Sequence, residues 1–315
     1  MKIPPNLLSF LKEEDNFFIA THINPEGDAL GSSLVLSMAL EILGKNTVVY
    51  DRDPVPDLYR YLPGHERFVH TTVTLQPSTF NLILLDCNAL ERAGIGGLLF
   101  KRSAVIDHHE TENDFGDIRW IEPGAAATGL MIFYLIKELG IEITGEIATN
   151  LYTAIAIDTG TFRYANTTAD VLRVAAELVE AGAKPGFVSN SLYETWSEKR
   201  FHLLITAMNT LEIRNNVAIT VVTQEMFKQT GTHADDTENF SGFPRMMKDI
   251  EISAFFRETD DNHWKVSLRS KGDINVARIA ALFEGGGHKN AAGFRIKGSL
   301  ASAKETLLNQ IRQSR

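Results

Sequence analysis

The stretch FFIATHINPEGDALGSSLVLSMALEILG (residues 17–44) decides the fold. It begins with a short apolar run at 17–21, which is typical of a strand covered on both faces. A polar loop follows, and residues 30–44 then form an apolar segment of helical length that ends at Gly44, a residue that favours a helix C-terminus. The stretch therefore predicts one strand–loop–helix unit of an α/β protein.

The same alternation continues through the first half of the chain. Further apolar runs typical of strands occupy 47–50, 82–85 and 104–106. Stretches typical of helices occupy 125–139, 145–157 and 168–181. Strands and helices that alternate in this way form a mostly parallel sheet flanked by helices, and we expect helices on both sides of it.

The pattern changes after Ala183-Lys184-Pro185-Gly186, which marks a boundary. A helix is expected at about 189–212, and the segments after it predict a smaller α/β domain with a mixed sheet. Its expected strands lie at 215–223, 250–258 and 263–270, and its helices at 274–284 and about 299–313. The chain is thus predicted to form a catalytic domain at 1–186, a helical linker at 187–212 and a substrate-binding domain at 213–315.

Composition limits the class of protein. At about 150 residues per domain, 315 residues predict two domains, and 44% hydrophobic with 23% charged residues excludes a disordered, collagen-like or coiled-coil chain. The longest apolar stretch, 125–136, is shorter than the roughly 20 residues of a membrane helix, and the N-terminal residues lack the apolar core of a signal peptide. A single cysteine, Cys87, excludes an internal disulfide framework. We therefore expect a cytoplasmic protein without a membrane partner.

Charge is distributed unevenly. The chain has 31 Lys and Arg against 40 Asp and Glu, a net charge of −9, which argues against a broad basic face for long nucleic acid. Residues 245–297 nevertheless carry a net charge of +3, so the rest carries −12. A chance distribution of charged residues explains the positive segment as well as a local anion-binding site does. The charge becomes informative only if other residues of this segment also indicate anion binding.

Acidic residues and histidines follow the apolar segments at four places. The clusters are His22 to Asp28, the single Asp86, the run Asp107-His108-His109, and Asp158. Taken singly, such residues also occur in turns and solvated loops, and Asp28 would favour a helix N-terminus electrostatically. Because the carboxyl ends of parallel strands share one edge of the sheet, however, we expect these groups to converge.

Metal binding explains such a convergence better than ion pairing does. Lysine and arginine are scarce in the four clusters, and an isolated buried carboxylate is too costly. The candidate ligands are His22, Glu26, Asp28, Asp86, His108 and Asp158. They exceed the needs of one tetrahedral ion and suit two divalent ions that share a bridging carboxylate. Oxygen and nitrogen ligands without sulfur favour Mn²⁺, with Mg²⁺, Co²⁺ or Fe²⁺ as alternatives.

At these residues the sequence resembles the DHH phosphoesterase superfamily. The segment His22-Ile-Asn-Pro-Glu-Gly-Asp28, then Asp86, Asp107-His108-His109 and Asp158-Thr-Gly, match its motifs in order. Gly285-Gly-Gly-His288 followed by Ala291-Ala-Gly293 resembles the marker of the DHH-associated C-terminal domain. Length and layout are most similar to the bacterial branch that degrades very short RNA and removes the 3′-phosphate from 3′-phosphoadenosine 5′-phosphate.

The resemblance implies a role for each residue. It places one metal at His22, Glu26 and Asp86. It places the other at Asp28, Asp86, His108 and Asp158, so that Asp86 is the bridge. His109 would stabilise the developing charge on the scissile phosphate, and Asp107 would orient an imidazole by a hydrogen bond. Position 26 is Glu where the family more often has Asp, but the longer side chain can still reach a metal, so we expect Glu26 to be a ligand.

The second domain offers candidate substrate contacts at Arg269, Gly286, Gly287 and His288. Glycines allow backbone N–H groups to approach an anion, and an arginine presents a fork suited to phosphate. Seen alone, these residues are equally typical of a turn after the 274–284 helix and of an ordinary strand end. Arg269 and the Gly-Gly-Gly-His segment both lie within residues 245–297, which carry a net charge of +3. The resemblance implies that this domain holds the far end of a short substrate. Long duplexes would be excluded by the cleft between the domains and repelled by the negative charge.

Other interpretations remain open. Cys87 is expected to be a buried structural thiol rather than a redox-sensitive one. Aromatic residues of the second domain are expected in the sheet core rather than stacked on a base: Phe255, Phe256, Trp264 and Phe283. The main function we expect is a two-metal phosphoesterase that hydrolyses very short RNA oligonucleotides to mononucleotides and also dephosphorylates 3′-phosphoadenosine 5′-phosphate.

Three other functions are weighed against it. A cyclic-dinucleotide phosphodiesterase, or a hydrolase of its linear product, is the close alternative, and a nucleotide-binding sensor with catalysis weakened by Glu26 is the non-enzymatic one. A manganese pyrophosphatase would lack the Gly-Gly-Gly-His marker. A homodimer is an expectation from the family alone.

Overall fold

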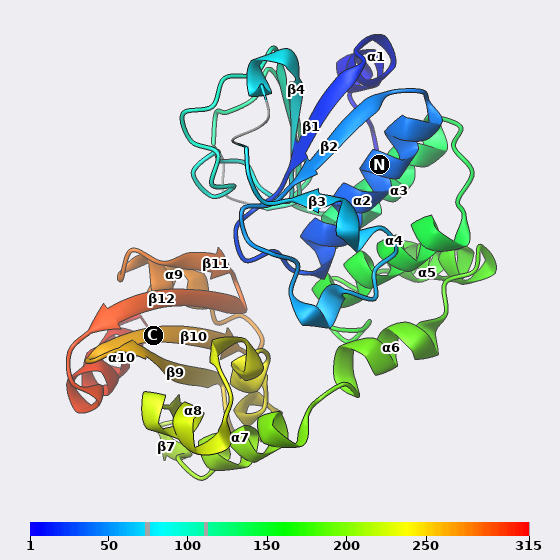
Figure 1. The fold of residues 1–315 in the computed structure, drawn as a ribbon. Coiled ribbons are helices and arrows are strands. Elements are labelled where there is room, and N and C mark those ends of the chain that lie inside the picture. The colour runs from blue at the N-terminus through cyan, green and yellow to red at the C-terminus, as the bar shows by residue number, and fades with distance from the viewer. Residues whose placement is uncertain (73–75, 110–112, 315) are drawn as a thin grey trace. The chain divides into compact units, whose positions relative to one another are not determined.

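The computed structural model describes residues 1–72, 76–109 and 113–314, and the chain forms two compact units, Met1–Thr195 and Trp196–Arg315 (Figure 1). The single helix expected at 189–212 is two helices, α6 (Pro185–Tyr193) in the first unit and α7 (Glu198–Met208) in the second. The interruption has a local cause, because the Ser197 side chain accepts a hydrogen bond from the N–H of Arg200 and so starts a new helix.

The first unit contains a six-stranded sheet in the order β3-β2-β1-β4-β5-β6, and all its neighbouring strands are parallel. The strands are β1 (Asn16–Ala20), β2 (Asn46–Tyr50), β3 (Phe68–Val69), β4 (Asn81–Leu85), β5 (Ser103–Asp107) and β6 (Ile118–Ile121). The four strands expected from sequence are confirmed to within a residue; the short β3 and β6 were not predicted. Strand order reverses between β1 and β4, which is where ligands bind in open sheets of this kind.

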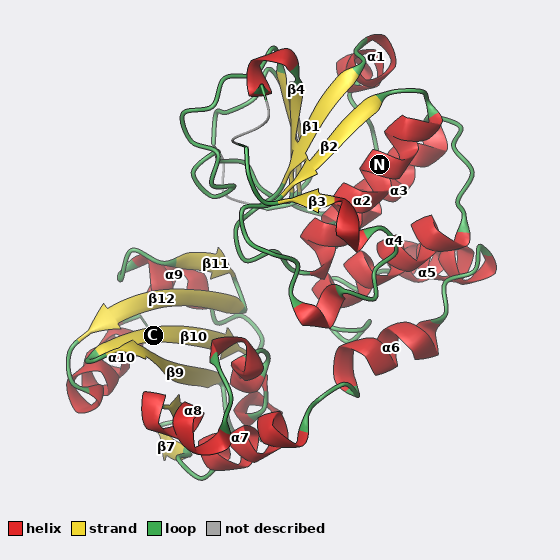
Figure 2. Cartoon of the chain, in the orientation of Figure 1, coloured by secondary structure: helices red, strands yellow, loops and turns green. Residues whose placement is uncertain are grey.

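Both faces of this sheet are covered, but by different kinds of structure (Figure 2). Phe17 and Ile19 share one hydrophobic core with the helices α1 (Pro5–Glu13), α2 (Gly27–Ile42), α3 (Thr128–Glu138), α4 (Gly145–Asp158) and α5 (Ala169–Glu180). Phe18 and Ala20, which alternate with them, contact a second core formed by the segment between β4 and β5. Residues 86–102, all described, contain no helix there. The structure thus differs from the expected helices on both sides, because this glycine-containing connection covers its face as an irregular loop.

Two glycines let α2, α3 and α4 pack closely. A Cβ at Gly31 would lie 2.5 Å from the backbone oxygen of Asn150, and one at Gly129 would lie 2.5 Å from the Cβ of Ala154. The close packing brings the start of α2, the start of α3 and the end of α4 together. These three helix ends carry Asp28, Thr128 and Asp158.

The second unit contains a mixed six-stranded sheet in the order β11-β12-β10-β9-β8-β7, with only β8 and β9 parallel among its neighbours. The strands are β7 (Glu212–Arg214), β8 (Val217–Val222), β9 (Ile252–Asp260), β10 (His263–Ser270), β11 (Gly286–His288) and β12 (Ala291–Lys297). The helices α9 (Val276–Ala281) and α10 (Leu300–Gln313) share a core with Val266 and Leu268, and α7 and α8 (Gln224–Thr230) pack around Phe255 on the other face.

Smaller features complete the two units. Among the residues that the structure describes, the short 3-10 helices are η1 (Asp57–Tyr59), η2 (His65–Arg67), η3 (Pro77–Thr79), η4 (Ala234–Thr237), η5 (Phe240–Gly242) and η6 (Pro244–Met246). Cys87 is buried, as are Phe255, Phe256 and Trp264, and Phe283 stacks on Phe294 at 4.2 Å between ring centres. The expected core roles of these residues are confirmed. Within the described residues, no helix has the length and apolar character needed to cross a membrane.

Candidate metal centre

The polar clusters of the first unit lie at the ends of three parallel strands and one helix. His22 follows β1, Asp86 follows β4, and Asp107 is the last residue of β5. Asp158 is the last residue of α4. Asp86 and Asp107 are only 5% and 0% exposed, so these charges lie in the protein interior. The position of His22 and Asp86 on either side of the strand-order reversal follows from the topology alone.

Asp28, His108 and Asp158 form one group whose potential ligand atoms all lie within 4.8 Å of one another. His108 Nε2 lies 3.1 Å from Asp158 Oδ2 and 3.8 Å from Asp28 Oδ2. Its other ring nitrogen, Nδ1, lies 3.2 Å from the carbonyl oxygen of Ala125. A proton on Nδ1 would therefore be held by the backbone, which directs Nε2 toward the carboxylates.

Asp86 directs its two oxygens toward different histidines. Oδ2 lies 3.4 Å from His22 Nε2, while Oδ1 lies 3.4 Å from His108 Nε2 and 3.7 Å from His109 Nδ1. A carboxylate with its oxygens facing two separate sets of donors has the geometry of a bridging ligand.

Asp28 caps a helix other than its own. Its carboxylate accepts hydrogen bonds from the backbone N–H groups of Thr128 and Gly129, each at 2.7 Å, at the start of α3. It also accepts one from the Ser32 hydroxyl at 3.0 Å. From sequence, Asp28 was expected to interact with the N-terminus of its own helix, α2. The N-terminus that stabilises its buried negative charge is instead that of α3, one hundred residues away.

Thr128 was not among the residues singled out from sequence as functional. Its hydroxyl donates a hydrogen bond to Asp86 Oδ1 at 3.1 Å, in addition to its backbone bond to Asp28. The only signal in the sequence is a polar residue followed by glycine at the start of an otherwise apolar helix.

Asp107 contacts His109 rather than the group around His108. Its Oδ1 accepts hydrogen bonds from His109 Nδ1 at 2.6 Å and from the backbone N–H of His109 at 3.1 Å. Asp86, Asp107 and His109 form a second group within 4.8 Å of one another. The other oxygen of Asp107 is buried and has no hydrogen-bond partner among the described residues.

Glu26 is less closely associated with the other candidates. It is exposed and occupies the position before the first residue of α2. The groups found within 4.8 Å among the described residues include neither Glu26 nor His22, although His22 contacts Asp86.

The cluster contains more carboxylates than histidines that can pair with them. The ion pairs that the structure gives Asp28, Asp86, Asp107 and Asp158 are all to histidines. Burial and the charges of Asp86 and Asp158 raise the pKa of Asp28 well above its ordinary value. Burial also opposes ionisation of Asp86, but hydrogen bonds from His108 and His22 outweigh it and hold the pKa of Asp86 well below its ordinary value.

The pKa values of two histidines are raised by the same carboxylates. Burial alone would lower the pKa of His22, but the hydrogen bond and charge of Asp86 outweigh it and raise the pKa to about 9. The pKa of His108 is likewise raised against its burial by Asp158 and Asp86. Protons on these rings therefore offset the carboxylate charge where a divalent cation would do so more fully. The donor set of carboxylates and imidazoles fits divalent metal ions.

In the second unit, Arg269 and His288 lie on one face of the sheet. Both are paired in register with Ala291, from β10 and β11 respectively, so the small Ala291 lies between them. Two strand spacings separate them, about 10 Å. A turn was one of the two interpretations of the Gly-Gly-Gly-His segment; in the structure Gly286–His288 forms the edge strand β11.

Two glycines of this segment are required by packing. A Cβ at Gly287, where φ is 139°, would lie 2.4 Å from the backbone oxygen of Ala291. A Cβ at Gly285 would lie 2.3 Å from the backbone oxygen of Gly293. At Gly286, by contrast, no heavy atom of the described residues other than its chain neighbours lies within 4 Å of the Cβ position. The glycines thus let β11 approach β12 closely, a reason that the sequence alone did not provide.

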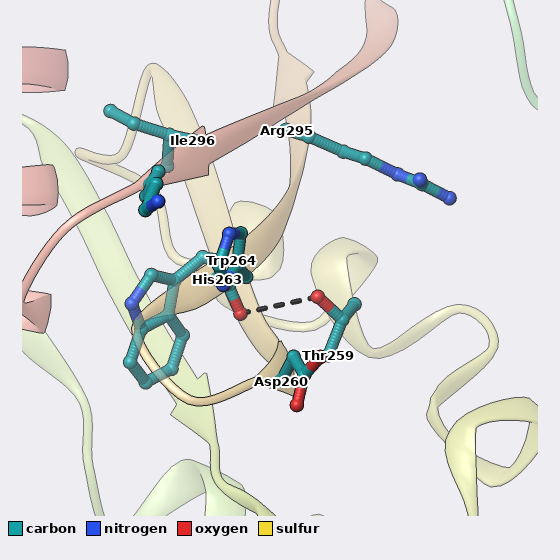
Figure 3. Close-up of a pocket in the computed structure, with 7 residues that line it drawn as sticks. Thr259, Asp260, His263, Trp264, Arg295 and Ile296 are labelled. Atoms are coloured by element: carbon teal, nitrogen blue, oxygen red, sulfur yellow. Dashed lines mark hydrogen bonds between the residues drawn. The ribbon is translucent and has the colours of Figure 1, made fainter.

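A pocket in the second unit includes His263 and Trp264 at the start of β10 (Figure 3). Arg269 lies near the other end of this strand. The residues that line the pocket are Thr259, Asp260, His263, Trp264, Arg295, Ile296 and Lys297. The Thr259 hydroxyl closes the hairpin by donating to the carbonyl oxygen of His263 at 3.2 Å. None of the residues singled out from sequence as a functional contact lines it.

Comparisons with known proteins cover both units. The DHH family, N-terminal domain, matches residues 16–155, and the DHHA1 domain matches residues 214–314. The bifunctional oligoribonuclease and PAP phosphatase NrnA of Thermus thermophilus is 37% identical over 302 residues, which are 95% of this chain and 90% of that protein. The protein of the same name from Bacillus subtilis is 27% identical over 290 residues, 90% of each chain.

A solved structure agrees with the fold. The crystal structure of an exopolyphosphatase-related protein from Bacteroides fragilis has a TM-score of 0.88 and 28% sequence identity. The match covers 98% of this chain and 94% of that one.

Proposed function

This chain belongs to the DHH family of phosphoesterases, and from that premise we propose that it hydrolyses very short RNA oligonucleotides to mononucleotides. We propose in addition that it removes the 3′-phosphate from 3′-phosphoadenosine 5′-phosphate. Relatives that this chain matches over nearly its whole length are named for both activities. The enzymes of this family depend on metal ions.

The observation that carries the proposal is the orientation of Asp86. One oxygen faces His22 and the other faces His108, which supports two metal positions with Asp86 between them. His22, Glu26 and Asp86 would hold one ion. Asp28, Asp86, His108 and Asp158 would hold the other. When bound, two such ions polarise phosphoryl oxygens and make hydroxide available near neutral pH. Mn²⁺ is the ion we propose, because the ligands are oxygen and nitrogen without sulfur.

His109 is the residue that we propose to contact the scissile phosphate. Its Nδ1 donates to Asp107 at 2.6 Å, which fixes the orientation of the ring. A proton on Nε2 would stabilise the charge that develops on the phosphoryl oxygens in the transition state. Asp107 accepts this hydrogen bond and so holds the ring in one orientation, and we therefore propose that Asp107 acts through His109.

Arg269, Gly286, Gly287 and His288 would bind another phosphate of the substrate. Arg269 and His288 lie on one face with only Ala291 between them, so both can contact the same anion. The edge strand that carries Gly286 and Gly287 adds backbone N–H donors. The net charge of +3 in residues 245–297 supports this assignment.

The deciding experiment measures release of mononucleotides from a labelled RNA dinucleotide with and without Mn²⁺. Metal-dependent release at a rate above that for a cyclic dinucleotide supports the proposal, and phosphate release from 3′-phosphoadenosine 5′-phosphate tests the second activity. Faster cleavage of the cyclic dinucleotide would favour that alternative substrate. Nucleotide binding without hydrolysis, with Mn²⁺ bound, would identify a sensor.

A further inference from the structure

Thr128 contacts both of the carboxylates that define the second metal position. It is the first residue of α3 and is fully buried. Its backbone N–H donates to Asp28 Oδ2 at 2.7 Å, and its hydroxyl donates to Asp86 Oδ1 at 3.1 Å. We propose that Thr128 is a positioning residue that fixes the rotation of Asp86 relative to Asp28. This inference rests on the proposed function, since it concerns the carboxylates that would hold the ions.

The hydroxyl matters because the ion pairs that Asp86 makes with other described residues are to imidazoles. His22, His108 and His109 approach its oxygens at 3.4 to 3.7 Å. A histidine that ligates a metal directs its lone pair to the ion and no longer donates to the carboxylate. Thr128 does not titrate and is not a ligand type that these ions require, so its bond to Oδ1 remains when the imidazoles are occupied.

The bond also determines which oxygen faces which histidine. With Oδ1 held by Thr128, Oδ2 is directed toward His22. Rotation of the carboxylate about its Cβ–Cγ bond would turn Oδ1 away from His108 and Oδ2 away from His22 at the same time. A hydroxyl that prevents the rotation therefore acts on both metal positions, although it contacts neither ion.

Thr128 is itself held in place from two directions. Its backbone is the start of a helix whose N-terminus is capped by Asp28, and Gly129 beside it packs against Ala154 of α4. The threonine and the two carboxylates are thus joined by hydrogen bonds. The interaction by which Asp28 stabilises the start of α3 therefore also holds Asp28 in place at the metal site. Removing a residue that hydrogen-bonds to a metal ligand typically lowers metal affinity or activity by about 10- to 100-fold.

The test measures Mn²⁺ binding to metal-free protein by isothermal titration calorimetry. Thr128→Val keeps the shape and removes the donor, and Thr128→Ser restores the donor. Thr153→Val is the matched control, because Thr153 is also a fully buried threonine of the first unit but donates to the Thr149 carbonyl oxygen in α4. We expect about 10- to 100-fold weaker Mn²⁺ binding for Thr128→Val, a matching loss of kcat, and values within a few-fold of wild type for the other two.

Thr128→Ala carries the same expectation and replaces the valine variant if that variant does not fold. Wild-type affinity in a folded Thr128→Val or Thr128→Ala protein would overturn the inference, and so would an equal loss in Thr153→Val. Failure of the wild-type protein to bind Mn²⁺ would instead overturn the proposed function, so the two failures are distinct.

Discussion

His109 Nδ1 lies 2.6 Å from Oδ1 of Asp107, and the same oxygen accepts the backbone N–H of His109 at 3.1 Å. One buried carboxylate oxygen therefore fixes both the ring and the backbone of the following turn. Because Asp107 ends β5, a strand paired on both sides within the sheet, the position of His109 is fixed by the sheet.

Asp107→Asn tests this relationship. An amide is a weaker hydrogen-bond acceptor than a carboxylate, so the His109 ring loses its fixed orientation and we expect kcat on a dinucleotide to fall by about 10- to 100-fold with little change in KM. Steady-state kinetics with saturating Mn²⁺ measure both constants. The same substitution at Asp117, which accepts hydrogen bonds from Ser103 at the other end of β5, serves as the control. Equal losses in the two variants would show that Asp107 is only structural.

Glu26 is expected to ligate a metal although it is exposed. Removing a residue that only supports a metal ligand already lowers metal affinity or activity by about 10- to 100-fold. We therefore expect Glu26→Ala to lower activity by at least about 10-fold. Glu26→Asp keeps a carboxylate and should keep activity. Initial rates across a Mn²⁺ titration measure the effect. The exposed Glu142, on the connection between α3 and α4, provides the control in Glu142→Ala. An alanine variant at position 26 with unimpaired activity would contradict the assignment.

Much of the first unit could be predicted because its signals are local. An apolar run followed at once by His22, Asp86 or Asp107 identifies both a strand and the edge where its polar residues converge. Thr128 could not be predicted in the same way. Its role depends on close packing of helices at Gly31 and Gly129, which brings together segments about one hundred residues apart.

The second unit was harder to predict at its candidate site. A strand of three residues with two glycines has the composition of a turn, so β11 was not expected from the sequence. Its pairing with β12 is what places His288 and Arg269 on one face. The hairpin of β11 and β12 is local, but the register of β10 on β12 pairs Arg269 with the more distant Ala291, and a local pattern cannot show that register.

Arg269→Ala is expected to weaken substrate binding without loss of metal. A hydrogen bond to a charged group contributes about 1.5–3 kcal/mol, so we expect kcat/KM for a dinucleotide to fall by about 10- to 100-fold. Kinetics combined with metal analysis of the purified protein separate the two effects. Arg278→Ala is the control, since Arg278 is exposed on α9, which packs on the other face of the sheet. Parallel loss of metal would mean that Arg269 has a structural role.

Gly287 and Gly286 form a matched pair for testing β11. Gly287→Ala places a Cβ 2.4 Å from the Ala291 oxygen at a φ of 139°, so we expect the second unit to lose about 1–3 kcal/mol of stability. Gly286→Ala has open space around its Cβ and should change stability by no more than about 0.5 kcal/mol. Thermal unfolding of the two variants measures the difference. Equal Tm values would contradict the packing of β11 on β12.

Metal binding should release protons, because the metal-free site carries them on histidine. The pKa of His22 is raised to about 9, above its ordinary value of 6.5, so at pH 8 most of the metal-free protein is protonated at this ring. Mn²⁺ requires the neutral imidazole, and binding should therefore release at least about one proton and strengthen as the pH rises toward 9. Titration calorimetry at pH 8 in two buffers of different ionisation enthalpy counts the protons. His22→Asn should release about one fewer, whereas an identical heat in both buffers for the wild type would exclude a protonated His22.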